Sequence, residues 1–279
     1  LTRCSGKEII AGYTSYPWAP DWERFRQIAD ACGAYLMADI AHPAGLVVAG
    51  AYPSPMGLAD VITFTTHKTI CGPRGAVIVT TRSDLARAID RAVFPGAQGG
   101  PHPNKFAAMA VAFQIAQTSP FRRLMFRITE NAQALAAALQ DRGLRLAYGG
   151  TDTHMVLLDL RGIETPTGEP LRGEVAVRIM ELAGLVANKN TIPGDEVTAL
   201  ASGVRLGTPW VSQRGMGPPE MEAIAQAFAD LLTAIYPFHY HGLRRELPRG
   251  KIDLEVLEAV RAKVTDLADA FVADTESLG

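Results

Sequence analysis

The stretch TFTTHKTICGPRG, residues 63–75, joins the end of an apolar strand to two basic side chains and a turn. Its first residues fit a buried strand, and the glycines and proline that follow are typical turn residues. His67 and Lys68 therefore stand where a strand ends. Charges at strand ends usually face water, so the position of Lys68 alone does not identify a site.

Alternating strand and helix signals surround this stretch. A helix is predicted over about 21–33, with an aspartate as its N-cap and a glycine at its end. A short apolar strand at 34–38 then leads to Asp39, and two further strands are predicted at about 60–66 and 75–80. This alternation predicts an α/β layer structure.

A long helix is predicted from Ser119, as N-cap, through Pro120 to Gly143. We expect a domain boundary at its start, which divides the chain into residues 1–118 and 119–279. The second part mixes strand and helix signals. A strand is predicted at 155–159, and helices near 173–183, 218–235 and 254–270.

Composition favours an ordinary globular protein of 279 residues, with 48% hydrophobic residues, 20% charged residues and a net charge of -2. This charge gives no reason to expect nucleic acid or a membrane as partner. The most apolar region, 36–52, contains Asp39, His42 and Pro43, which argues against a membrane span. Three widely separated cysteines favour a reduced, cytoplasmic compartment. Because the chain starts at Leu1, we expect that its natural beginning is missing.

Asp39 and Lys68 end two strands that we expect to be neighbours. Ligands of open α/β sheets bind beyond the carboxyl ends of the strands. Pyridoxal phosphate requires a lysine for its Schiff base and an acid that keeps its ring nitrogen protonated. The pair therefore suits this cofactor, although spacing alone favours two solvated charges.

Several long motifs, in order along the chain, closely resemble serine hydroxymethyltransferase. They are DIAHPAGL at 39–46, TTHKTICGPRG at 65–75, VFPGAQGGP at 93–101, GGTDTH at 149–154, NKN at 188–190 and SGVRLGTP at 202–209. The resemblance implies an α/β fold of type I, like aspartate aminotransferase. Residues 1–118 would then be the C-terminal part of the large domain that binds pyridoxal phosphate, and residues 119–279 a smaller α+β domain.

The resemblance also implies roles around the cofactor. Lys68 would form the Schiff base with pyridoxal 5'-phosphate, and Asp39 would pair with the pyridinium nitrogen. His42 would lie on the side of the phenolic oxygen. Thr65 and His67 would line the pocket near the Schiff base.

Further implied roles fall elsewhere in the chain. Thr14 stands where the family has a serine that contacts the cofactor. Arg205 would bind the substrate carboxylate, and Asn190 would lie on the folate side. Gly99 and Gly100 would approach the cofactor phosphate of a neighbouring subunit, which implies a homodimer or tetramer.

The implied function is glycine hydroxymethyltransferase activity, the interconversion of serine and glycine with transfer of a one-carbon unit to and from tetrahydrofolate. Residues 195–202, DEVTALAS, depart from the Pro/Phe loop that contacts folate in many relatives. A folate-independent 3-hydroxy amino acid aldolase or transaldolase, or an α-methylserine hydroxymethyltransferase, stays open. So does a catalytically incomplete fragment, because the family's N-terminal stacking residue, phosphate loop and folate-side glutamate are not identified here.

Two basic stretches near the end of the chain have ordinary interpretations. His239 and His241 lack an acidic or cysteine companion in sequence, so we expect a solvated tail and no metal site. The run at 244–251 is too short and too mixed in charge to indicate nucleic-acid binding.

Overall fold

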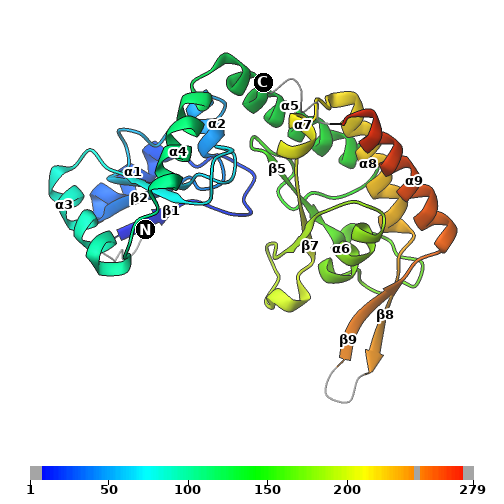
Figure 1. Cartoon of the computed structure of the whole chain (residues 1–279). Coiled ribbons are helices and arrows are strands. Elements are labelled where there is room, and N and C mark those ends of the chain that lie inside the picture. Colours follow the sequence, from blue (N-terminus) through cyan, green and yellow to red (C-terminus); the bar gives the residue numbers. More distant parts are fainter. Residues whose placement is uncertain (1–7, 242–245, 273–279) are drawn as a thin grey trace. The chain divides into compact units, whose positions relative to one another are not determined.

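A computed structural model describes residues 8–241 and 246–272. Two compact units form the chain (Figure 1). The first unit comprises residues 1–14 and 19–126, and the second comprises residues 15–18 and 127–279. Helix α5 (Ser119–Asp141) runs from one unit into the other. The predicted domain boundary between residues 118 and 119, at the start of this helix, stays a prediction.

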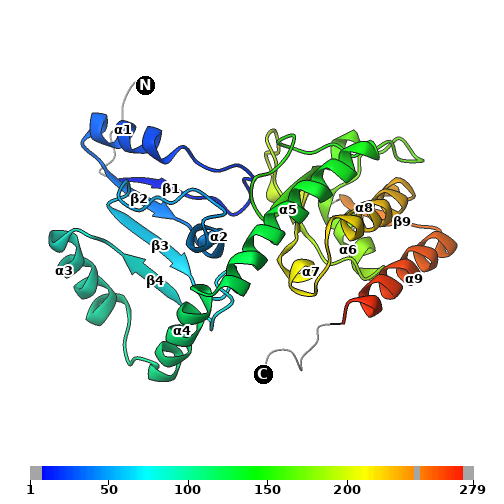
Figure 2. The ribbon, with the colours of Figure 1, turned by 90° about the horizontal axis from the view of Figure 1, so that it is seen from above.

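The first unit contains a mixed four-stranded sheet in the order β1-β2-β3-β4, whose strands lie side by side in Figure 2. Strands β1, β2 and β3 are parallel, and β4 is antiparallel to β3. The bounds are Glu8–Ala11 for β1, Tyr35–Asp39 for β2, Val61–Thr65 for β3 and Ala76–Val79 for β4. The three strands predicted in this region are confirmed, whereas β1 was not predicted. Because β1 to β3 are parallel, their carboxyl ends meet at one edge of the sheet.

Capping residues define both ends of the first helix of this unit. At the start of α1 (Trp22–Cys32), Arg24 N–H donates to the Asp21 side chain at 2.9 Å. Gly33 closes the helix with a φ of 64°, so the predicted caps are confirmed. The other helical elements are α2 (Ala44–Ala49), α3 (Ser83–Arg91), the π-helical segment η1 (Ala92–Ala97) and α4 (Pro103–Ala116).

The second unit is built around a three-stranded antiparallel sheet in the order β5-β7-β6. Its strands are β5 (Met155–Asp159), β7 (Gly203–Gly207) and β6 (Asn188–Asn190). The helices are α6 (Gly173–Leu182), α7 (Pro209–Gln213), α8 (Pro218–Thr233) and α9 (Leu254–Ala270), with short 3-10 turns η2 (Leu160–Gly162) and η3 (Thr198–Leu200). The strand and the three helices predicted here are confirmed.

Apolar side chains of this sheet and its helices form one core. Fully buried members come from α5, β5, α6, β7 and α8, including Leu139, Leu158, Met180, Val204 and Leu231. Burying a side chain of this size contributes about 1.5–3 kcal/mol. The core therefore fixes β7, which carries Arg205, and β7 in turn pairs with β6, which carries Asn190.

Two expectations for this part of the chain are wrong in detail. Thr118, and not Ser119, caps α5, because its Oγ1 accepts from Phe121 N–H at 3.4 Å. Instead of a tail, β8 (Tyr236–His241) and β9 (Glu246–Lys251) pair as an antiparallel hairpin, in which His239 and Tyr240 are exposed to solvent as expected. His239 also has an acidic neighbour that sequence did not reveal, Glu169, with 3.8 Å between Nδ1 and Oε2.

In the part of the chain that is described, no helix has the length and apolarity needed to span a bilayer.

Candidate functional site

Three strand ends gather at the carboxyl edge of the first unit's sheet. Asp39 closes β2 and lies opposite Thr63 of β3, while Lys68 follows the end of β3 after a short turn. Gly12, directly after β1, has a φ of +154° and lies so close to β2 that a Cβ would be 2.1 Å from the Asp39 carbonyl oxygen. Only glycine permits this approach. The predicted neighbourhood of the Asp39 and Lys68 strands is confirmed.

The Asp39 carboxylate is half-buried and makes one hydrogen bond with the described residues. Ala41 N–H donates to its Oδ1 at 2.9 Å. The second oxygen, Oδ2, therefore remains able to accept from a cationic N–H group. A carboxylate prepared in this way fits a protonated pyridine nitrogen.

Backbone hydrogen bonds fix the turn that carries Lys68. Thr66, which is fully buried, donates its N–H to Gly75 O at 3.0 Å and its Oγ1–H to Pro73 O at 2.6 Å. Gly72 N–H donates to Thr66 O at 2.7 Å. Because residues 72–75 fold back onto Thr66 through these three hydrogen bonds, they hold in place the turn from which the half-buried Lys68 side chain extends.

Threonine hydroxyls join this turn to the loop that follows Asp39. Thr69 Oγ1 donates to His42 O at 2.7 Å and accepts from Gly45 N–H at 2.9 Å. Thr65 Oγ1 donates to Ala41 O at 3.2 Å. Thr65 and His42 thus lie where the two loops meet. Thr69 was not singled out from the sequence, because its partners lie 24 and 27 residues away.

His67 carries a buried ring nitrogen. Its Nδ1 has no hydrogen-bond partner among the residues that are described. Leaving such an atom without a partner costs about 1–3 kcal/mol, so unsatisfied buried atoms call for an explanation such as a bound ligand. The Asp39 Oδ2 atom and this imidazole nitrogen therefore leave hydrogen-bonding capacity that a polar ligand could use.

Other expected cofactor contacts lie on the surface of the first unit. Thr14 is exposed, a short distance along the chain from β1. Gly99 and Gly100 are exposed between η1 and α4, and a Cβ on either glycine would meet open space. A close approach of these glycines to a phosphate stays a prediction.

Arg205 and Asn190 belong to the second unit, so a common site with Lys68 stays a prediction. Arg205 lies in the middle of β7, with Leu157 of β5 opposite on one side and Asn188 of β6 on the other. Burial lowers the pKa of its guanidinium. Asn190 closes β6 and donates from Nδ2 to Thr191 O at 2.9 Å.

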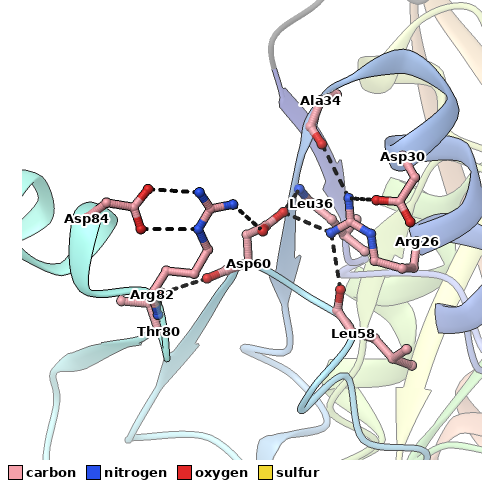
Figure 3. A network of polar contacts seen from close by, with 9 residues as sticks. All are labelled: Arg26, Asp30, Ala34, Leu36, Leu58, Asp60, Thr80, Arg82 and Asp84. Carbon is pink, nitrogen blue, oxygen red and sulfur yellow. Dashed lines mark hydrogen bonds and ion pairs between the residues drawn. The ribbon is translucent and has the colours of Figure 1, made fainter.

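An ionic network at the opposite edge of the first sheet was not predicted (Figure 3). Asp60, directly before β3, accepts from Leu36 N–H of β2 at 2.8 Å and from Arg26 Nη1 at 2.9 Å. Its second oxygen accepts from Arg82 Nη1 at 3.0 Å. Burial alone would raise the pKa of Asp60, but these hydrogen bonds outweigh burial and the pKa is lowered. The sequence gave no signal for this network, because Arg82 and Arg26 lie 22 and 34 positions from Asp60 along the chain.

Comparison with known proteins gives a consistent result. A family profile described as "Serine hydroxymethyltransferase" matches residues 2–228. A serine hydroxymethyltransferase of Synechococcus sp. (strain JA-3-3Ab) is 47% identical over 272 residues, which cover 95% of this chain and 59% of the relative. A serine hydroxymethyltransferase of Rippkaea orientalis is 47% identical over 229 residues, which cover 82% of this chain and 52% of that relative. The chain therefore spans between half and two thirds of the length of these relatives.

Proposed function

Because the chain belongs to the serine hydroxymethyltransferase family, we propose that the protein interconverts serine and glycine, with tetrahydrofolate as the one-carbon acceptor and donor. The observation that carries this proposal is the pairing of β2 with β3, which brings the Asp39 and Lys68 strand ends to one edge. The open Asp39 oxygen and the buried His67 Nδ1 support pyridoxal 5'-phosphate as the cofactor at this edge.

The residues of the first unit would divide the work of holding this cofactor. Lys68 would attach it covalently through its amine, and Asp39 would keep a proton on the ring nitrogen. When bound, the cofactor supplies an electron sink for the bond that breaks at the substrate α-carbon. His42 and Thr65 would line the site, with their backbone positions fixed by the threonine bridges. Thr14 would add a hydroxyl contact.

Two residues of the second unit would bind the substrates. Arg205 presents a planar set of N–H donors that matches the two oxygens of an amino-acid carboxylate. Its half-buried position supports this role, because a partly desolvated guanidinium binds an anion more strongly than a solvated one. Asn190 would contact the folate side.

A second copy of the protein is the expected partner. Gly99 and Gly100 would donate backbone N–H groups to the cofactor phosphate of a neighbouring subunit, in a homodimer or tetramer. Exposed apolar side chains on α4 support such a contact, since Phe106 and Val111 are 58% and 57% exposed.

An acceptor-independent relative is the second candidate. The loop at 195–202 departs from the Pro/Phe loop that contacts folate in many relatives, and it exposes Val197 and Leu200. This difference favours a folate-independent 3-hydroxy amino acid aldolase or transaldolase. An α-methylserine hydroxymethyltransferase would keep the folate chemistry and differ in its substrate pocket.

Two measurements test the proposal in the protein expressed from its complete natural coding sequence. Borohydride reduction followed by peptide mapping should place the cofactor on Lys68, and a label on another lysine would refute this assignment. Serine cleavage should accelerate when tetrahydrofolate is added. Ready cleavage of allo-threonine with no response to tetrahydrofolate would replace the transferase with an aldolase. A preference for α-methylserine would change the substrate and keep the folate chemistry.

A further inference from the structure

The loop at 191–202 connects the two strands that carry Asn190 and Arg205. Asn190 ends β6 and lies opposite Gly203, the first residue of β7. The two ends of the loop are therefore neighbours, while its middle extends away from the sheet. Contacts that hold these ends together limit the paths open to the residues between them.

A single carboxylate joins the two ends. Asp195 Oδ2 accepts from Ile192 N–H at 3.0 Å and from Ser202 N–H at 2.9 Å. Its Oδ1 accepts from Ser202 Oγ at 2.7 Å. Burial alone would raise the pKa of Asp195, but the hydrogen bonds from Ser202 and Ile192 outweigh burial and the pKa is lowered. Asp195 is therefore ionised at neutral pH and binds both sides of the loop at once.

The turn next to Asp195 is tied to β5 by an arginine. Arg161 donates to both oxygens of the buried Asp159, each at 2.9 Å, and its Nη1 donates to Pro193 O at 3.1 Å. Gly194 has a φ of +94° and lies so close that a Cβ would be 3.0 Å from Arg161 Nη1. A side chain at Gly194 would strain the backbone and press on this arginine.

A second arginine supports the returning side of the loop. Arg172 Nη1 donates to Ser202 Oγ at 3.1 Å and to Leu200 O at 3.3 Å. The loop is thus held at both ends, and residues between the ends are exposed. Val197 and Leu200 are 52% and 42% exposed, so the held loop displays two aliphatic side chains to solvent.

We propose that Asp195 is a positioning residue for the one-carbon acceptor, because its carboxylate holds the ends of the loop that follows Asn190 and exposes Val197 and Leu200. The inference rests on the proposed function, which assigns the acceptor side to Asn190. Asp195 touches no reacting atom and acts through the loop. Two aliphatic side chains at a fixed place suit the flat apolar part of an acceptor better than the same side chains on a mobile loop, because less conformational entropy is lost on binding.

Two substitutions and a neighbouring control test this role in the protein from its complete coding sequence. Asp195→Ala removes all three hydrogen bonds, and Asp195→Asn retains an acceptor for part of them. Glu196→Gln changes the adjacent exposed carboxylate and leaves the Asp195 contacts in place. Hydrogen exchange of peptides from 191–202 should accelerate at least about tenfold in Asp195→Ala, less in Asp195→Asn and not at all in Glu196→Gln.

Kinetics separate positioning from a purely structural role. The KM for tetrahydrofolate should rise about tenfold in Asp195→Ala, the size expected when charge-assisted hydrogen bonds are lost. The glycine dissociation constant and kcat at saturating tetrahydrofolate should stay close to those of the unmodified protein. The KM for tetrahydrofolate of Asp195→Asn should lie between the values of the unmodified protein and of Asp195→Ala.

Three results would overturn the inference in distinguishable ways. Unchanged exchange of 191–202 in Asp195→Ala would show that the carboxylate does not hold the loop. Faster exchange with an unchanged KM for tetrahydrofolate, or with equal losses for glycine, would show that the loop does not position the acceptor. An unmodified protein that shows no response to tetrahydrofolate would refute the proposed function itself, and the acceptor role with it.

Discussion

Asp39 and Asp60 are carboxylates at opposite ends of the same pair of strands, and they differ in what they bind. Asp60 receives hydrogen bonds from Leu36, Arg26 and Arg82. Asp39 receives one from Ala41 among the residues described. The Asp60 carboxylate uses its capacity to accept hydrogen bonds within the fold, whereas the Asp39 carboxylate keeps part of that capacity for a ligand. Unused hydrogen-bonding capacity, more than residue type, distinguishes a site from a structural contact.

The comparison also shows what each carboxylate connects. Asp60 links β3 to β2 through its side chain, and Thr80 Oγ1, directly after β4, donates to its carbonyl oxygen at 2.7 Å (Figure 3). Arg26 extends the network to α1 and donates further to Leu58 O. Asp60 thus holds elements of the sheet together, and Asp39 holds only its own loop.

The largest expected effect is on activity. Asp39→Asn should lower kcat for serine cleavage by about 10²- to 10³-fold, as when one preorganised electrostatic partner is removed from an active site. The unfolding midpoint in urea should change little, because a single local hydrogen bond is affected. Assay of the protein from its complete coding sequence, beside Asp60→Asn, checks this. An Asp60→Asn protein with an equal loss of kcat per folded molecule would contradict the distinction.

The second effect is on stability. Asp60→Ala should lower the free energy of unfolding by about 3 kcal/mol, because it leaves Arg26 and Leu36 N–H without their partner in a partly buried place. Urea unfolding followed by circular dichroism measures it. Asp84→Ala is the matched control, since Asp84 also pairs with Arg82 but is exposed, and its effect should be clearly smaller. Equal effects would show that Arg82, and not Asp60, is the important member.

The third prediction concerns a substitution that disturbs the sheet at the carboxyl ends of its strands and leaves the Asp60 network intact. Gly12→Ala places a Cβ against the Asp39 backbone at a φ of +154°, so we expect a loss of about 2 kcal/mol in the free energy of unfolding. Gly33→Ala is the control, because it also has a positive φ but open space around the Cβ position. A loss no greater than that of Gly33→Ala would mean that β1 moves away at little cost.

Sequence predicted the parts of the molecule that depend on local pattern. The α/β fold of type I, with a partial large domain, is confirmed by family membership and by the mixed sheet. The strands leading to Asp39 and Lys68 were predicted because they are short runs rich in apolar and β-branched residues, YLMA in β2 and VITFT in β3. Strand β1 was missed although β4 is equally short, because β1 begins with a charged residue, Glu8, and has two β-branched residues where β4 has three.

The networks could not be predicted, because they depend on pairing between distant residues. Nothing in the sequence indicates that the Asp60 side chain, directly before β3, accepts a hydrogen bond from Leu36 N–H of β2. The loop at 195–202 was recognised only as a departure from the family. Its Asp195 contacts depend on the hairpin register of β6 and β7, which places Asn190 opposite Gly203.

The smallest effect concerns pH and follows from the lowered pKa of Asp60. A carboxyl group with a folded pKa below its ordinary value of 3.8 contributes stability that is complete well above pH 3.8. That contribution is lost as pH falls through 3.8 toward the folded value, because the unfolded chain then binds the proton first. One such group changes the slope of the unfolding free energy by at most about 1.4 kcal/mol per pH unit.

Urea unfolding of the unmodified protein and of Asp60→Asn, measured between about pH 7 and pH 3, checks this prediction. The two free energies of unfolding should differ by a constant amount above about pH 6. Below about pH 5 the two curves should converge, since the unmodified protein alone loses the Asp60 contribution. Parallel curves down to pH 3 would show that the network holds the sheet through Arg26 and Arg82 without the charge on Asp60, and the contrast with Asp39 would then rest on hydrogen bonding alone.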